Sequence, residues 1–376
     1  MQTLPKLNTN ILGVNIRPEM QLLLCCASTK IDVAKTEEIK SLIQRADLDW
    51  QDVIGNAYKH GLMPLLYTNL NAIAPDIVPK NVLNQLRNIF YTNAQRSLML
   101  TGELVQLLRL LQENEILAVP YKGPVLANLL YGNIGLRQFC DLDILVQQQD
   151  VLKFKNLLIT RGYRPKIQLT EVEEINYLKD KSKHTYNFIN DSKGIMVEIH
   201  WRITPRYTSA IEVKYIWENL HSSSLGGMEI YSFSAEDWLL LLTNHASRHR
   251  WEKLSWLADI AELLRQNTEI NWEIVIQKAN DFDCKRMLFL GLFLTRQLIG
   301  INLPIGVINK ITNDHKVAKL ASEICLDILN KTNTNHKFMQ NTRYHIQVRE
   351  RLHNKILYLE LFWRWLIRDK SILLDE

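Results

Sequence analysis

Hydrophobic residues recur at three- and four-residue spacing along the first part of the chain, and this spacing indicates amphipathic helices. The pattern predicts helices over residues 19–26, 36–45, 50–60 and 79–110, with a further short helix from Pro64. Asp47 and Asp49 stand just before Trp50, where an acidic side chain can cap the helix that follows. We therefore expect an N-terminal helical region over residues 1–110.

The pattern changes to strict alternation in the middle of the chain, which favours strands. A β-favouring run over 116–121 leads into Lys122-Gly123-Pro124, and a second strand is predicted for Asp141–Val146. Two further alternating runs, 184–189 and 195–202, flank Asn-Asp-Ser-Lys-Gly and read as an antiparallel hairpin. These strands, with short helices between them, predict a small mixed sheet over residues 111–205.

Polar and apolar positions divide between the two faces of these strands. Successive side chains of a strand point to opposite faces, so Asp141 and Asp143 share one face. In the run 195–201 the same alternation sends the apolar side chains inward and leaves Glu198 and His200 on the other face. Three carboxylates from neighbouring strands can therefore converge, and oxygen clusters of this kind hold Mg²⁺.

Amphipathic helical spacing returns after Pro205 and predicts a C-terminal helical domain over residues 206–376. His245 and His249 stand four residues apart, but the run HASRH lacks the glutamate of HExxH, so we do not expect zinc there. Packing against the core is the expected role of this segment, with His245 or Arg248 at the rim of the cleft. A last helix is predicted for 344–367, and its excess of Lys and Arg would suit either solvent or an acidic partner.

Composition sets limits on this α+β arrangement. The 376 residues carry a net charge of +5, which is mild for the length and does not demand nucleic acid. Five scattered cysteines with no CxxC pair suit a reducing cytoplasm. Residues 1–17 lack the basic start and apolar run of a signal peptide, and the longest apolar run, 287–294, is too short for a bilayer. We expect a cytoplasmic protein with no membrane partner.

Four motifs together resemble a known family. They are Lys-Gly at 122–123, Tyr-Gly followed by Leu-Arg at 131–137, Asp-Leu-Asp-Ile-Leu-Val at 141–146, and Val-Glu-Ile-His-Trp at 197–201. The combination is similar to an uncharacterised bacterial nucleotidyltransferase family of the DNA polymerase β-like superfamily. The resemblance runs from about Leu111 to Arg202, with a weaker echo over 238–264. It implies a polymerase β-like core with helical regions on both sides.

The resemblance also implies roles for individual residues. Asp141, Asp143 and Glu198 would be the catalytic and metal-binding carboxylates, with Mg²⁺ or Mn²⁺ as the cofactor. Lys122, Gly123 and Arg137 would hold the phosphates of an NTP.

The phosphate-binding turn departs from the superfamily in one position. Gly123 is expected at the N-cap of a short helix, where free amides favour an anion. The superfamily has glycine or serine next, and this chain has Pro124, so one phosphate contact is lost and Lys122 would compensate.

Two of these assignments leave an alternative from the residues themselves. Arg137 could instead form a structural ion pair with Asp141 or Asp143. His200 has two interpretations: a hydrogen-bonded supporting role, which is the more common one for such histidines, and direct contact with the nucleotide or the acceptor, for which we also include it among the nucleotide-binding residues.

The function that follows is nucleotidyl transfer by two metal ions, one activating an acceptor hydroxyl and the other neutralising the leaving pyrophosphate. ATP is the expected NTP. The acceptor is open: a protein or peptide side chain (AMPylation) or a small molecule is favoured over RNA, since no RNA-binding module is recognisable. The alternatives are a pseudoenzyme that binds nucleotide or a partner without turnover, and a kinase that uses the same metal site.

Overall fold

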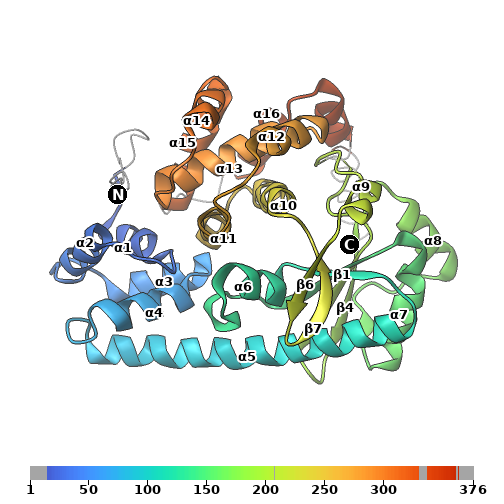
Figure 1. Ribbon diagram of the computed structural model, residues 1–376, viewed down its shortest axis with the longest axis horizontal. Helices are drawn as coiled ribbons and strands as arrows, with labels where there is room; N and C mark the ends of the chain where they lie inside the picture. The colour runs from blue at the N-terminus through green and yellow to red at the C-terminus, as the bar shows by residue number, and fades with distance from the viewer. Residues whose placement is uncertain (1–14, 207, 330–336, 361–362, 364–376) are drawn as a thin grey trace, which may run out of the picture.

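The computed structural model describes residues 15–206, 208–329, 337–360 and 363 of the chain. It has an α+β fold in which a small five-stranded mixed sheet lies between two sets of helices (Figure 1). The predicted class, a small mixed sheet flanked by N- and C-terminal helical regions, is confirmed. The division at residues 110 and 205 stays a prediction, and one connected set of buried apolar side chains includes residues from all three stretches.

Five helices form the N-terminal region, close to the positions that the apolar spacing predicts. They are α1 (Pro18–Cys26), α2 (Val33–Ile43), α3 (Trp50–His60), α4 (Met63–Ile73) and α5 (Lys80–Glu113). Asp49 caps α3 as expected, because its carboxylate accepts hydrogen bonds from two amides of the first turn. Asp47 instead binds the side chain of Arg45.

The helix α5 is the longest element and connects the two halves of the molecule. Its 34 residues extend over about 50 Å. One part packs on α4, and the other packs on the sheet at its first strand, β1 (Ala118–Tyr121), and on the short 3-10 helix η1 (Ile134–Leu136) (Figure 1). The N-terminal helices and the sheet therefore share one continuous support.

The sheet has the order β1-β2-β5-β4-β3. Its other strands are β2 (Asp141–Val146), β3 (Arg164–Pro165), β4 (Thr185–Asn190) and β5 (Ile195–His200). The strands β2 and β5 are parallel neighbours, and the remaining pairs are antiparallel, including the predicted β4–β5 hairpin. Between the strands lie α6 (Gly123–Tyr131), the 3-10 helix η2 (Gln148–Asp150), α7 (Val151–Thr160) and α8 (Glu171–Lys179).

The alternation in the two central strands gives the predicted burial. The apolar side chains of both strands that were expected to face the core are all buried: Leu142, Ile144, Val146, Val197, Ile199 and Trp201. A slip of one residue in either strand would exchange these side chains for the acids, so the hydrophobic pattern fixes the register. The acids are therefore held on a defined face of the sheet.

The C-terminal region is mostly helical, but the prediction of helix alone after Pro205 is wrong. After α9 (Val213–Glu218) the chain forms a hairpin of β6 (His221–Leu225) and β7 (Met228–Ser232). Three consecutive serines conceal the alternation of β6, whereas the turn residues Gly226 and Gly227, both with positive φ, carry the hairpin signal. The strand β7 packs against β1.

Helices make up the described chain after this hairpin. They are α10 (Ala235–Arg248), α11 (Leu254–Gln266), α12 (Trp272–Asp281), α13 (Lys285–Leu298), α14 (Ile305–Thr312), α15 (His315–Leu329) and α16 (Lys337–Val348), and residues 352–360 are helical as well. The helix predicted over 344–367 is confirmed for 344–348 and 352–360, but it is interrupted at 349–351, which are not helical. Residues 361–362 and 364–367 of that prediction lie outside the described residues.

A buried ion pair joins the core to this C-terminal layer. Arg137, which follows η1, donates from Nε and Nη2 to both carboxylate oxygens of Asp259 on α11 at 3.0–3.1 Å. The Tyr131 hydroxyl at the end of α6 donates to the same carboxylate at 2.8 Å, and Asp259 has no exposed surface. Four hydrogen bonds and one opposite charge thus satisfy an acid that would be costly to bury alone.

We expect Asp259→Leu to lower the free energy of unfolding by about 3–5 kcal/mol, because it leaves the Arg137 guanidinium buried without a counter-charge. The double variant Arg137→Met/Asp259→Leu removes both charges and should recover most of that loss. Urea unfolding of the two variants and the wild type measures the difference. A double variant as unstable as Asp259→Leu would show that the pair is not the coupling between these layers.

Candidate active site

Two acids face each other across the parallel strand pair at the centre of the sheet. Asp143 of β2 lies in register with Glu198 of β5. Asp143 is buried, with 4% of its surface exposed, and Glu198 is half-buried. Together with His200 they form a group in which one ligand atom from each residue lies within 4.8 Å of the others. Two carboxylates and an imidazole within this spacing are a donor set that fits a divalent cation.

His200 connects these two acids to the neighbouring strand. Its Nε2 lies 2.9 Å from Asp143 and 3.4 Å from Glu198, and its Nδ1 lies 2.6 Å from the Tyr121 hydroxyl. The ring is almost fully buried. The structure therefore shows the hydrogen-bonded support that the sequence left as an alternative, and the contact with nucleotide stays a prediction. Tyr121 was missed, although it directly precedes the Lys-Gly motif.

Lys122 supplies the positive charge next to the acids. Its Nζ lies 2.9 Å from Asp143. Burial by itself would raise the pKa of Asp143, but the charges and hydrogen bonds of Lys122 and His200 outweigh it and hold that pKa well below its usual range. Burial also opposes ionisation of Glu198, and the hydrogen bond from His200 reverses this and lowers its pKa. Both carboxylates are therefore ionised at neutral pH.

Asp141 lies on the same side of β2, two residues before Asp143, but it is not part of the 4.8 Å group. Burial, followed by the charge of Asp143, raises its pKa from 3.8 to about 6. The three predicted carboxylates are thus close enough to interact electrically, with Asp143 and Glu198 in contact through His200. Asp141 is the acid that a bound cation would have to stabilise most.

The backbone of the Lys-Gly turn is unusual. Helix α6 begins at Gly123 with Lys122 as its N-cap, one position earlier than predicted. Lys122 has φ 56° and ψ −152°, a region that is otherwise almost restricted to glycine and costs about 1–3 kcal/mol. Gly123 has φ 41°, and a Cβ there would come 3.2 Å from the Asp141 carbonyl oxygen. The chain therefore holds Lys122 in a strained conformation with its ammonium on Asp143.

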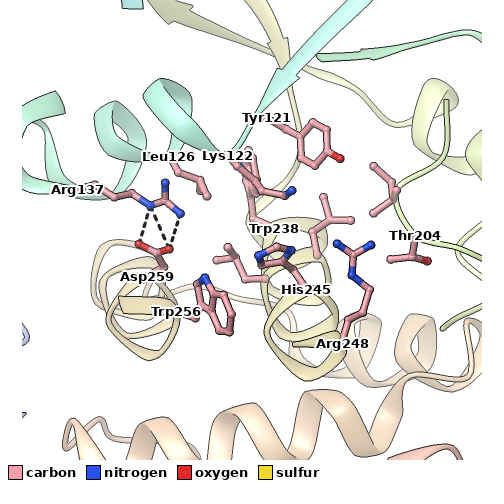
Figure 2. A pocket seen from close by; sticks show the side chains of 13 residues that line it. Tyr121, Lys122, Leu126, Arg137, Thr204, Trp238, His245, Arg248, Trp256 and Asp259 are labelled. Carbon is pink, nitrogen blue, oxygen red and sulfur yellow. Dashed lines mark hydrogen bonds and ion pairs between the residues drawn. The ribbon is translucent and has the colours of Figure 1, made fainter. Parts of the chain in front are cut away.

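A pocket lies beside this turn, between the sheet and helices α10 and α11. Figure 2 shows its lining, which includes Lys122, Arg137, His245, Arg248 and Trp256. Its cavity volume is about 20 Å³, room for about one water molecule. Lys122, Arg137 and Arg248 bring donors and positive charge to its walls, and aromatic and aliphatic side chains form most of the exposed lining.

Arg137 lines this pocket but its charge is already balanced. Its ion pair is with Asp259 and not with Asp141 or Asp143, the two partners considered from the sequence. The predicted contact of Arg137 with phosphate stays a prediction. The sequence assigned Asp259 no role beyond its place in a helical segment that packs on the core. Nothing in the sequence indicates that it binds Arg137, which lies 122 residues earlier in the chain.

His245 at the end of α10 and His249 just after it pack against each other and against Trp256. His249 Nε2 accepts a hydrogen bond from Arg248 Nη2 at 3.1 Å, and Arg248 Nη1 donates to His184 Nε2 at 2.5 Å. Burial and the charge of Lys122 lower the pKa of His245 well below 6.5. These residues face the cleft from the C-terminal layer, as expected for His245 and Arg248.

Paired acids on one strand, a third carboxylate on its parallel neighbour and a lysine-glycine turn that begins a helix define a site of the nucleotidyltransferase class. A family model described as uncharacterised nucleotidyltransferase matches residues 46–300, which is more than half of the chain. The protein belongs to this family. Neither the curated proteins nor the solved structures gave a match.

The family match is longer than the stretch that carries the sequence resemblance. It starts before α3 and ends after α13, so it includes most of the N-terminal helices and the C-terminal layer around the pocket. The nucleotidyltransferase family expected from the motifs is confirmed. In the described residues, no helix has the length and apolar content needed to cross a membrane.

The strained turn makes an unusual prediction about stability. A protein with glycine in the middle of a helix or strand normally has a free energy of unfolding about 0.5–1 kcal/mol lower than the same protein with alanine there. We expect the opposite at residue 122: Lys122→Gly should be more stable than Lys122→Ala by about 1 kcal/mol, because both lack the ammonium and only glycine accepts this φ and ψ. Urea unfolding measures the difference, and the usual order of the two variants would show that the turn is unstrained.

The raised pKa of Asp141 predicts a pH-dependent gain in stability for Asp141→Asn. A folded-state pKa of about 6 against 3.8 means that the metal-free wild type loses stability as pH rises through this range. The amide cannot ionise, so the variant should match the wild type near pH 4 and exceed it by about 2 kcal/mol above pH 7. Unfolding curves in EDTA across pH 4–8 test this, and a constant difference between the two proteins would contradict it.

Proposed function

We propose that this protein transfers a nucleoside monophosphate from an NTP, with ATP as the expected donor, to a hydroxyl group of an acceptor. The observation that carries the proposal is the register of β2 and β5, which sets Asp143 directly beside Glu198 with Asp141 on the same side of β2. Two ionised carboxylates with oxygens within 4.8 Å of each other, one of them buried, repel one another unless a cation lies between them. Such an arrangement is suited to a bound cation and a polyphosphate.

Asp141, Asp143 and Glu198 are proposed to hold Mg²⁺ or Mn²⁺, with His200 at the same centre. The donor set supports this, because carboxylate oxygens suit Mg²⁺ and Mn²⁺. When bound, the ions would supply positive charge for the triphosphate and for a developing alkoxide.

Lys122 and the first turn of α6 are proposed to bind phosphate oxygens. The helix has nine residues, and its first amides have no intrahelical partners, so its N-terminus favours an anion. Pro124 lies in this first turn and has no amide hydrogen, which leaves the amides of Gly123 and Val125 and the Lys122 ammonium as donors. The strain at Lys122 is explained if its side chain must point at the acids and the substrate.

The reaction itself is a displacement at the α-phosphorus. The acceptor oxygen forms a bond to this phosphorus, the bond to the β-phosphate oxygen breaks, and pyrophosphate leaves. Glu198 is ionised and half-buried, so its carboxylate is suited to accept the proton that the acceptor hydroxyl releases. Lys122 is placed to balance negative charge on the phosphates during the step.

The acceptor is proposed to be a protein or peptide side chain, as in AMPylation, or a small molecule. A net charge of +5 over 376 residues gives little support for RNA. The pocket between the sheet and helices α10 and α11 lies beside the acids and belongs to the part of the chain that would shape substrate choice.

Transfer of label from α-labelled and γ-labelled NTPs, with Mg²⁺ or Mn²⁺ and a cell lysate as the source of acceptors, tests the proposal. We expect α-label on an acceptor and a loss of more than about 100-fold in Asp141→Asn/Asp143→Asn and in Glu198→Gln. Asp191→Asn is the matched control, since Asp191 is an exposed acid at the β4–β5 turn that pairs with Arg164. It should transfer label like the wild type.

Each other outcome favours a different function. Transfer of γ-label alone would establish a kinase and overturn nucleotidyl transfer. Nucleotide binding without transfer, across all four NTPs and both metals, would favour a pseudoenzyme. Equal transfer by the wild type and the double variant would show that the acids of β2 are not the catalytic group.

A further inference from the structure

Arg248 differs in its contacts from the other arginines near the pocket. Arg137 pairs with Asp259, and Arg250 pairs with Asp327. The guanidinium of Arg248 donates hydrogen bonds to two imidazoles, those of His184 and His249, and within the described part of the chain no carboxylate forms an ion pair with it. Half-buried arginines usually have an anionic partner.

The two histidines that hold Arg248 are neutral. A guanidinium has only N–H donors, so both Nε2 atoms must be unprotonated acceptors, and each ring carries its proton on Nδ1. The histidines therefore fix the direction of the guanidinium without cancelling its charge.

This charge lies next to the acidic centre. The His184 ring is 5.8 Å from the His200 ring, and His200 binds Asp143. Arg248 and Lys122 line the same pocket, and Figure 2 shows both side chains reaching into it from opposite sides, Lys122 from the sheet and Arg248 from α10. Two cations thus face a shared space beside the carboxylates.

We propose that Arg248 binds the β- and γ-phosphates of the NTP, the part that leaves as pyrophosphate. This inference rests on the proposed function and names the residue that completes its phosphate site. The two histidines occupy two of the five N–H donors of the guanidinium, and the remaining donors are available to phosphate oxygens.

Arg248 could bind either the acceptor or the phosphates of the NTP, and the charges of these two substrates favour the phosphates. The reacting α-phosphate must lie at the carboxylates, whereas two imidazoles, those of His184 and His200, lie between Arg248 and Asp143. A hydroxyl acceptor is neutral and gains little from an unbalanced guanidinium, but pyrophosphate carries several negative charges and suits a planar fork of donors. The helix α10 therefore contributes a phosphate-binding cation, which compensates for the contact that is lost at Pro124 in the first turn of α6.

Binding of inorganic tripolyphosphate, ATP and adenosine by calorimetry, each with saturating Mg²⁺, tests this assignment. We expect Arg248→Gln to weaken tripolyphosphate and ATP by about 10- to 100-fold, the range of charge-assisted hydrogen bonds, and to leave adenosine unchanged. Arg248→Lys keeps the charge but not the planar fork of donors, so its affinity for tripolyphosphate should lie between that of the wild type and that of Arg248→Gln. Arg164→Gln removes one positive charge from an exposed pair at the sheet edge and should bind like the wild type.

The design separates this inference from the proposed function. Unchanged affinity of Arg248→Gln for tripolyphosphate would overturn the assignment even if α-label transfer is found. An equal loss for adenosine and tripolyphosphate would also overturn it, because it would show a general structural role. Weaker tripolyphosphate binding in a protein that transfers no label would keep Arg248 as an anion-binding residue and reject nucleotidyl transfer.

Discussion

The candidate active site depends on balancing negative charges that the sheet brings together. Register places Asp143 against Glu198, and Asp141 follows two residues away on the same side. Alone, these carboxylates would repel one another and resist burial. Lys122 and His200 offset the repulsion at Asp143, while Asp141 retains a raised pKa. The acids are thus only partly compensated in the protein itself, which leaves a favourable interaction for a cation.

The sequence predicts this centre well because its signals are local. Alternation places two acids on one face of β2, and a four-residue turn determines the β4–β5 hairpin that carries Glu198. The same reasoning misses the serine-rich strand β6, where side chains give no apolar period. It also misses the break after Val348 between α16 and the helical residues 352–360, because apolar spacing alone does not show where a chain turns.

Contacts between distant segments are what the sequence did not predict. Arg137 was expected to face phosphate or the acids of β2, and it binds Asp259, 122 residues further along. Arg248 was placed only at the rim of the cleft, and its significance depends on His184, 64 residues away. A motif shows which chemistry a residue can perform. Whether another side chain already balances the charge of that residue depends on tertiary packing.

The length of α5 has a mechanical consequence for substrate entry. The helix is uninterrupted and packs on both α4 and the sheet, so it is rigid, and bending it would break its backbone hydrogen bonds. Relative motion between the N-terminal helices and the sheet is therefore opposed along this whole length. We therefore expect a movement that widens the pocket to displace α11 on the C-terminal side. The Arg137–Asp259 ion pair joins α11 to the core, so this movement would either break the ion pair or move both residues together.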